Sequence, residues 1–186
     1  TDSVALGALA GVLFGGAVGL FNGLVVTRLR VNSLIATIAT LMILQGAVYL
    51  YSREAVQNTH RLPLFTDLST GYLGPVPVPV IIAALVFAAA SLVLSRTLLG
   101  RQVYAVGANA TAARLSGIRP DRIRVLLFVV TGLLVGLAGL ILASLMNAGQ
   151  PTAGRGFELT VVAAVILGGT SLTGGRGTLL GTLLGV

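Results

Sequence analysis

The side chains that could do acid–base, nucleophilic or metal chemistry in this chain are few and scattered. None of the five carboxylates lies at a catalytic spacing from another, and His60, the only histidine, has no potential metal ligand near it in the sequence. There is no Cys to supply a thiolate, and no Lys, which a GxxxxGKS/T phosphate-binding loop requires. We therefore expect no enzyme activity, no cofactor and no metal site in this chain.

The remaining candidates are polar side chains, all but one of them neutral, in or next to apolar segments. Ser33, Thr37 and Thr40 follow at i, i+4 and i+7, so they share one face of a helix. Such a face could line a path for a hydroxyl-rich solute, but Ser and Thr in membrane helices often bond only the carbonyl one turn back. The full candidate set for a translocation path is Ser33, Thr37, Thr40, Asn147, Gln150, Thr152, Glu158, Thr170, Ser171 and Thr173.

The elements that hold these side chains are predicted to be membrane-spanning helices. Of the 186 residues, 55% are hydrophobic and 9% charged, whereas a soluble domain carries about 25% charged residues. A helix rises about 1.5 Å per residue and a bilayer core is about 30 Å thick. Four apolar runs are long enough to cross it: 4–26, 31–51, 76–95 and 125–146. We expect an all-α, polytopic transmembrane helical bundle that forms a single domain over residues 1–186.

Two further apolar segments lie near the end of the sequence. Residues 158–169 are too short to cross, and the polar run GGTSLTGGRG begins at Gly168. This pattern indicates a broken or re-entrant half-helix, with Glu158 at the positive end of its dipole. A short crossing that leaves the glycine-rich run on the cytoplasmic side is the alternative. A last run starts near residue 177 and is still apolar at residue 186, and the first residue is not Met, so we expect an internal fragment of a longer protein.

The arginines predict the orientation of the helices. Eight arginines lie between the first and second spans and between the third and fourth, against two between the second and third. Short cytoplasmic loops carry an excess of basic residues. Residues 96–124 are therefore expected in the cytoplasm and residues 52–75 outside it. The net charge of +7 arises from arginines that follow this distribution between loops. We therefore expect no binding to nucleic acid.

Glycines recur at every fourth position in the first span. Such a row gives one smooth face on which another helix can pack closely. Gly132 and Gly136 repeat the spacing in the fourth span, and further glycines repeat it in the last segment. These rows predict close helix packing and indicate nothing about a substrate. The first row consists of Gly7, Gly11, Gly15, Gly19 and Gly23.

The loop 96–124 contains signals for a short helix. Asn109 is a favourable N-cap and Gly117 a favourable residue just beyond a helix, which predicts about two turns from Ala110 to Ser116. So short a helix is not stable alone. On these residues, a docking element and a solvated connector are equally compatible with the pattern.

Several long segments resemble a known family in the same order. GRQVYAVGANATAARLSGI, GLLVGLAGLILASLMNAGQPTAGRGFEL and AAVILGGTSLTGGRGTLLGTLLG resemble the ribose-type branch of the monosaccharide ABC-transporter permeases, part of a superfamily shared with branched-chain amino acid permeases. NGLVVTRLRVNSLIATIATLMILQGAVYLYS is similar to the preceding helices of that family. The resemblance covers nearly the whole chain. Ala108 and Arg155 are departures from residues common in the family.

The resemblance implies an importer permease in the bacterial inner membrane. Its expected partners are a cytoplasmic ATPase with two cassettes, an extracytoplasmic sugar-binding protein, and a second permease subunit that forms a homodimer or heterodimer. The short helix in the loop 96–124 then corresponds to the coupling helix that docks on the ATPase. The coupling residues implied are Gly107, Asn109, Ala112, Ala113, Arg114, Leu115, Ser116, Gly117 and Ile118.

Two other classes of function are compatible with the residues. A secondary carrier or facilitator of a small polar solute would need no ATPase, and intramembrane carboxylates or a sodium site would favour it. The four long spans contain no interior charge, which disfavours a proton relay. The third class is a membrane scaffold that transports nothing. A uniformly apolar interior would favour it, and four polar residues argue against such an interior: Asn147, Gln150, Thr170 and Thr173.

Overall fold

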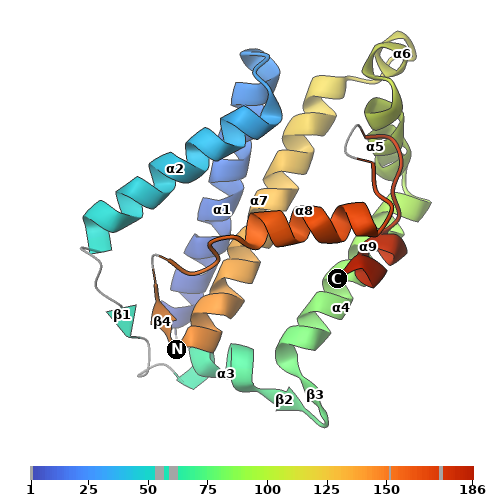
Figure 1. The fold of residues 1–186 in the computed structure, drawn as a ribbon. Coiled ribbons are helices and arrows are strands. Elements are labelled where there is room, and N and C mark those ends of the chain that lie inside the picture. Colours follow the sequence, from blue (N-terminus) through green and yellow to red (C-terminus); the bar gives the residue numbers. More distant parts are fainter. Residues whose placement is uncertain (1, 53–56, 59–62, 151, 172–173) are drawn as a thin grey trace. The chain divides into compact units, whose positions relative to one another are not determined.

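The computed structural model describes residues 2–52, 57–58, 63–150, 152–171 and 174–186. These residues form helices joined by short turns, with two pairs of very short strands (Figure 1). The all-α fold expected from the sequence is confirmed. The helices are α1 (Asp2–Arg28), α2 (Ser33–Ser52), α3 (Pro63–Thr70), α4 (Val78–Arg96), α5 (Leu98–Ala108), α6 (Ala110–Leu115), α7 (Pro120–Met146), α8 (Phe157–Leu167) and α9 (Leu179–Gly185). The strands are β1 (Gln57–Asn58), β2 (Tyr72–Leu73), β3 (Val76–Pro77) and β4 (Ala148–Gly149).

Among the described residues, four helices are long and apolar enough to cross a membrane: α1 from Ala5, α2 to Tyr51, α4 and α7. They overlap the four apolar runs seen in the sequence. Their ends differ by a few residues because polar capping residues, such as Asp121 in the first turn of α7, continue a helix beyond the point where hydropathy falls. Many large apolar side chains on these helices are exposed, including Leu6, Leu34 and Leu85. Exposing that much apolar surface to water is unfavourable, whereas contact of the same surface with lipid is not.

The chain divides into two compact units. The first comprises Thr1–Ile81 with Arg124–Ala153, and the second comprises Ile82–Ile123 with Gly154–Val186. The prediction of one permease domain over the whole length stays a prediction.

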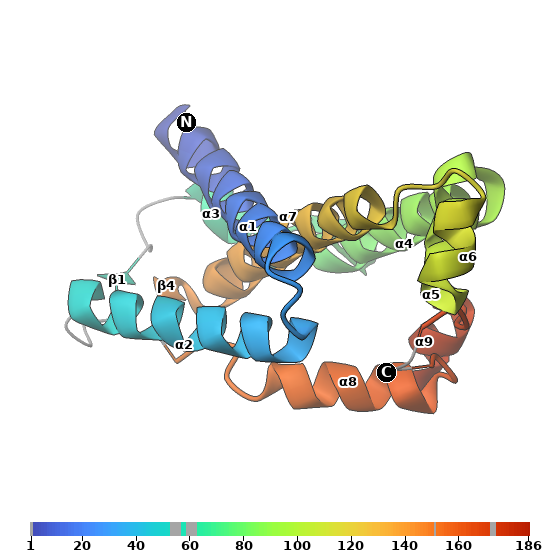
Figure 2. The same ribbon diagram turned by 90° about the horizontal axis from the view of Figure 1, so that it is seen from above.

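In the first unit, α1 crosses α7 at very close range (Figure 2). A Cβ atom on Gly15 would collide with the Gly132 carbonyl oxygen, and one on Gly19 with the Phe128 carbonyl oxygen. Conversely, a Cβ on Gly136 would lie 2.9 Å from Val12 Cα. The expected close packing of the glycine row therefore exists in its central part. It does not extend to Gly7, where a Cβ atom would have no neighbour within 4 Å.

A tight turn joins α1 to α2 in the same unit. Arg30 adopts a left-handed conformation with φ 54°, and the Asn32 side chain accepts a hydrogen bond from the Leu34 N–H at 2.9 Å, which caps α2. The two helices are also joined by their side chains, because the Thr40 hydroxyl donates to Asn22 Oδ1 at 2.7 Å.

The described residues between α2 and α4 form more regular structure than their sequence indicates. It contains α3 and the antiparallel hairpin β2–β3, in which Tyr72 pairs with Pro77. Strand β1 pairs with β4, which follows α7, with Gln57 opposite Gly149. Ser144 of α7 is fully buried and donates to the Phe65 carbonyl, with Ser69 at 2.8 Å. These contacts attach α3 to the end of α7, and none of them has a signal in the sequence.

In the second unit, α5 turns sharply away from α4. Thr97 lies between them as the N-cap of α5, and its hydroxyl accepts from the Gly100 N–H at 3.3 Å. Gly100 is required there because a Cβ would collide with the Leu94 carbonyl oxygen. This eleven-residue helix is absent from the sequence-based expectation, since its hydropathy is intermediate.

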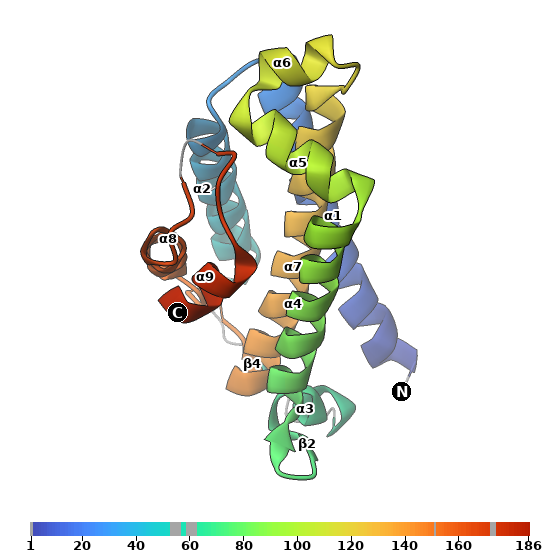
Figure 3. The same cartoon turned by 90° about the vertical axis from the view of Figure 1, so that its right-hand side faces the viewer.

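Helices α8 and α9 form a hairpin in the second unit (Figure 3). They pack through small residues: Gly181 meets Gly168, and Gly185 meets Ala164. The pairing runs antiparallel, because residue numbers rise along α9 as they fall along α8. At eleven residues, α8 is about 16 Å long, which is half of a bilayer core.

Candidate functional site

Helix α6 has well-formed ends at the residues expected from the sequence. Asn109 Oδ1 accepts from the Thr111 and Ala112 N–H groups, each at 3.0 Å. At the other end, Gly117 has φ +82°, and the Ile118 N–H donates to the Ala113 carbonyl at 3.0 Å. This is the Schellman arrangement, in which a left-handed glycine ends the helix. The helix stops at Leu115, with Ser116 as its C-cap, one residue short of the expected end.

One face of α6 is buried and the other is exposed. Ala113 packs in a small core with Val106 of α5 and Ile123 of α7, and Ile118 packs against this core. The other face carries Leu115, 87% exposed. The buried face holds α6 on α5 and α7, and the exposed face is open to a partner. The docking role of α6 stays a prediction.

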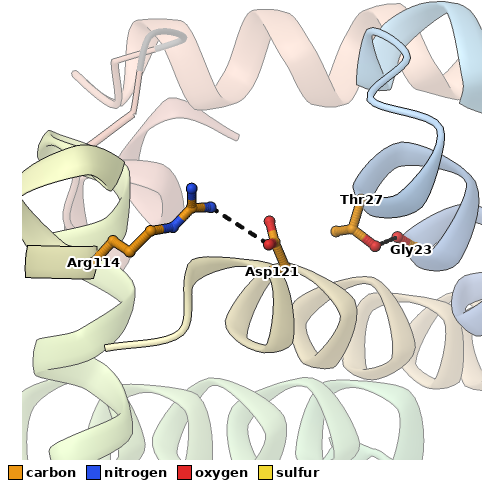
Figure 4. Close-up of polar contacts among 4 residues, drawn as sticks. All are labelled: Gly23, Thr27, Arg114 and Asp121. Atoms are coloured by element: carbon orange, nitrogen blue, oxygen red, sulfur yellow. Dashed lines mark hydrogen bonds and ion pairs between the residues drawn. The ribbon is translucent and has the colours of Figure 1, made fainter. Parts of the chain in front are cut away.

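Arg114 also lies on the exposed side of α6. Its guanidinium is 3.5 Å from the Asp121 carboxylate of α7, and both side chains are more than half exposed (Figure 4). A surface pair of this kind contributes about 0–1 kcal/mol. The ion pair therefore orients α6 weakly, and most of its position comes from the apolar core and the caps.

The α5 helix packs against the segment that leads from α8 to α9. A Cβ on Gly107 would lie 2.7 Å from the Gly175 nitrogen, and one on Gly175 would lie 2.6 Å from Ala108 Cα. The Tyr104 hydroxyl donates to the Gly177 carbonyl at 3.0 Å. Gly175 also has φ +76°, which side chains other than glycine rarely adopt. The candidate coupling residues and the glycine-rich run are therefore joined within one unit.

We expect Tyr104→Phe to loosen this junction without unfolding the protein. The change removes one neutral hydrogen bond and should cost about 0.5–1.5 kcal/mol. Hydrogen exchange of residues 174–178 should speed up while α7 is unaffected. Tyr72→Phe, on the exposed β2–β3 hairpin, is the matched control and should leave exchange unchanged. Equal exchange in Tyr104→Phe and the parent protein would show that the bond does not hold the segment.

The candidate path residues are divided between the two units. In the first unit, the Thr37 hydroxyl donates to the Ser33 carbonyl at 2.9 Å. This is the bond to the carbonyl one turn back that the sequence left as an alternative. The Thr27 hydroxyl donates to the Gly23 carbonyl in the same way (Figure 4). Asn147 ends α7 in a left-handed conformation, φ 50°. The first unit holds Ser33, Thr37, Thr40, Asn147, Gln150 and Thr152.

In the second unit, the Glu158 carboxylate accepts from the Gly156 N–H at 3.1 Å, at the N-terminus of α8. Thr170 lies in the turn after α8, where its hydroxyl is 3.5 Å from that of Thr182. Ser171 follows in the same turn and donates its N–H to the Arg176 carbonyl at 2.9 Å. Thr173 lies outside the described residues.

A cavity of about 400 Å³ lies between α1, α2 and α7 in the first unit. Thr37 is the one residue of the expected path set among its lining residues. Asn22 also lines it, only 8% exposed, and was missed in the sequence. An amide within a 27-residue apolar helix was the available signal. In the part of the chain that the structure describes, no group of three His, Cys, Asp or Glu side chains lies close enough to hold a metal ion.

Comparison with known families decides what kind of membrane protein this is. The family described as "Branched-chain amino acid transport system / permease component" matches residues 1–186. The chain belongs to this permease family. Membership confirms the resemblance drawn from the motifs, and with the four apolar helices it makes the permease a multi-pass integral membrane protein.

The permease is also similar to named sugar permeases. It is 43% identical over 185 residues to the ribose import permease protein RbsC of Escherichia coli, covering 97% of this chain and 58% of that protein. It is 42% identical over 177 residues to RbsC of Haemophilus influenzae, covering 94% and 55%. It is 42% identical over 187 residues to the L-arabinose ABC transporter permease protein AraH of Azospirillum brasilense, covering 100% and 55%. The chain spans little more than half the length of these relatives. No solved structure matches it.

Proposed function

We propose that this chain forms part of the permease subunit of an ATP-driven importer for a sugar or sugar-like solute in the bacterial inner membrane. The observation that carries the proposal is the family membership, together with relatives named as ribose and L-arabinose permeases. Nine of the ten candidate path residues are neutral, and Glu158 is the exception. This supports the proposal, because hydroxyl-rich solutes are bound by hydrogen bonds and do not need charges.

The proposed mechanism assigns ATPase docking to the segment from Gly107 to Ile118. The exposed Leu115 and the capped, compact form of α6 support this role. ATP binding draws the two cassettes together, and α6 moves with the surface on which it docks. The junction of Tyr104 with Gly177 would pass this movement to the α8–α9 hairpin, which we propose is re-entrant. Movement of packed helices as rigid bodies then opens the path to one side at a time.

The remaining assignments follow from the same proposal. Residues 96–124 face the cytoplasm, where the ATPase is, and residues 52–75 face outward. There, an extracytoplasmic binding protein delivers the sugar, and α3 with the β2–β3 hairpin offers it an ordered surface. A second permease subunit, identical or related, completes the path.

The test uses single cysteines in the full-length protein, from which any other cysteine has been removed; residues 1–186 contain none. Cysteine at Ala112, on the exposed side of α6, should cross-link in native membranes to a protein with Walker motifs, identified by mass spectrometry. Cysteine at Ala113 is the matched control: it is one residue away but only 4% exposed, so it should capture nothing. A thiol at position 112 that is readily labelled yet captures no ATPase would contradict the proposal and favour a secondary carrier.

A further inference from the structure

Asn22 is an unusual residue for its surroundings. It is 8% exposed on an otherwise apolar helix, and it lines the cavity between α1, α2 and α7. Its Oδ1 accepts from the Thr40 hydroxyl at 2.7 Å. Within the described residues, its NH₂ group has no hydrogen-bond partner. An amide has two N–H donors there, and leaving a buried donor unpaired is unfavourable. The cavity therefore contains donors that lack an acceptor.

The chemistry of the other lining residues indicates which kind of ligand could supply that acceptor. Thr37 and Thr131 add hydroxyl groups, and Phe14 and Phe128 add aromatic surface, with the rest aliphatic or glycine. No lining residue carries a charge. A volume of about 400 Å³ falls within the range of about 300–1,000 Å³ that small-molecule sites occupy. Aromatic and aliphatic walls with a few neutral hydrogen-bonding groups suit a sugar, which has apolar C–H faces and hydroxyl edges.

The cavity is lined in part by the close contact of α1 with α7, where Gly15, Gly19 and Gly132 carry no side chains. Thr131 is exposed and makes no hydrogen bond among the described residues, so its hydroxyl is available. The Thr40 bond orients the Asn22 amide by its oxygen, which leaves the NH₂ group to a ligand.

We propose that Asn22 is a solute-binding residue, whose NH₂ group donates to a hydroxyl or ring oxygen of the sugar in this cavity, with Thr131 as a second contact. The inference rests on the proposed function for its choice of solute. It adds to it a specific binding position that the candidate path set did not contain.

The experiment measures binding without requiring transport. Val135 lines the cavity on α7, one turn beyond Thr131, and is 63% exposed. In full-length protein carrying Val135→Cys as its only cysteine, a small water-soluble maleimide should label the thiol. D-ribose or L-arabinose at millimolar concentration should slow that labelling. Labelling that no sugar slows, or a thiol that the reagent never reaches, would overturn the proposal; an acyl chain filling the cavity would give the second result.

Three variants in the same background separate binding from packing. Asn22→Leu should raise the half-protecting sugar concentration about tenfold or more, the effect of one lost hydrogen bond of about 1.4 kcal/mol. Thr40→Val removes the α1–α2 bond that orients the amide but keeps the NH₂ donors, so protection should weaken much less than in Asn22→Leu. Equal effects of these two variants would show that Asn22 serves only to join the helices, and would overturn the proposal.

Thr131→Val provides a measurement that does not depend on the folding of Asn22→Leu. The side chains have the same shape, and the hydroxyl makes no bond whose loss could unfold α7. Protection should weaken several-fold, and unchanged protection would count against the site. Sugar protection measured in membranes that lack any ATPase tests the binding site alone. Capture of an ATPase through position 112 tests the importer. Each proposal can therefore fail while the other stands.

Discussion

Replacing Gly19 with leucine is expected to prevent α1 from packing on α7. A Cβ at this position would collide with the Phe128 carbonyl oxygen and lie 3.2 Å from Val129 Cα. Both are backbone atoms, which cannot rotate away as a side chain can. Overpacking a core costs about 1–3 kcal/mol, and with a rigid neighbour we expect the upper end of this range or more. The measurement is the fraction of protein recovered monodisperse in mild detergent, with its thermal unfolding midpoint.

Gly7→Leu is the matched control for that prediction. Gly7 belongs to the same row at the same four-residue spacing, but nothing lies within 4 Å of the position that a Cβ would take. The variant should be recovered as well as the parent protein. If Gly7→Leu and Gly19→Leu were equally damaging, the loss would come from a general change in α1 and not from its contact with α7.

Replacing Leu115 with aspartate is expected to weaken docking of the ATPase strongly under the proposed function. The side chain is 87% exposed, so its loss removes almost no internal packing and the protein should fold normally. A central apolar contact in an interface contributes about 2 kcal/mol or more, so affinity for the ATPase should fall about 30-fold or more. Sugar uptake driven by ATP should fall in parallel, measured in proteoliposomes that contain the binding protein.

Asp121→Asn separates this effect from a simple change of charge near α6. It removes the ion pair with Arg114, which at 3.5 Å and high exposure contributes about 0–1 kcal/mol. Docking and uptake should stay within a few-fold of the parent values. A loss as large as that of Leu115→Asp would show that the ion pair, and not the exposed leucine, is what the partner recognises.

Much of the secondary structure and part of the site could be predicted from the sequence, because their causes are local. The length of an apolar run decides whether a helix can cross a bilayer, and the four long helices follow from it. Caps act within one turn, so Asn109 and Gly117 predict α6 to within one residue. The family follows from long motifs in order, and the comparison confirms it.

The tertiary structure decided the features whose causes lie far apart in the chain. A row of glycines has one spacing throughout, yet only contact with α7 separates Gly19, which is packed on backbone, from Gly7, which is open. Likewise, the sequence shows Asn22 only as one amide in an apolar helix. Its bond with Thr40 and its place in the lining of the cavity come from the tertiary structure. The Tyr104–Gly177 bond and the β1–β4 pairing join residues more than seventy positions apart. Sequence periodicity reports the face of a helix on which a residue lies, but not what packs against that face, and packing is what determines these contacts.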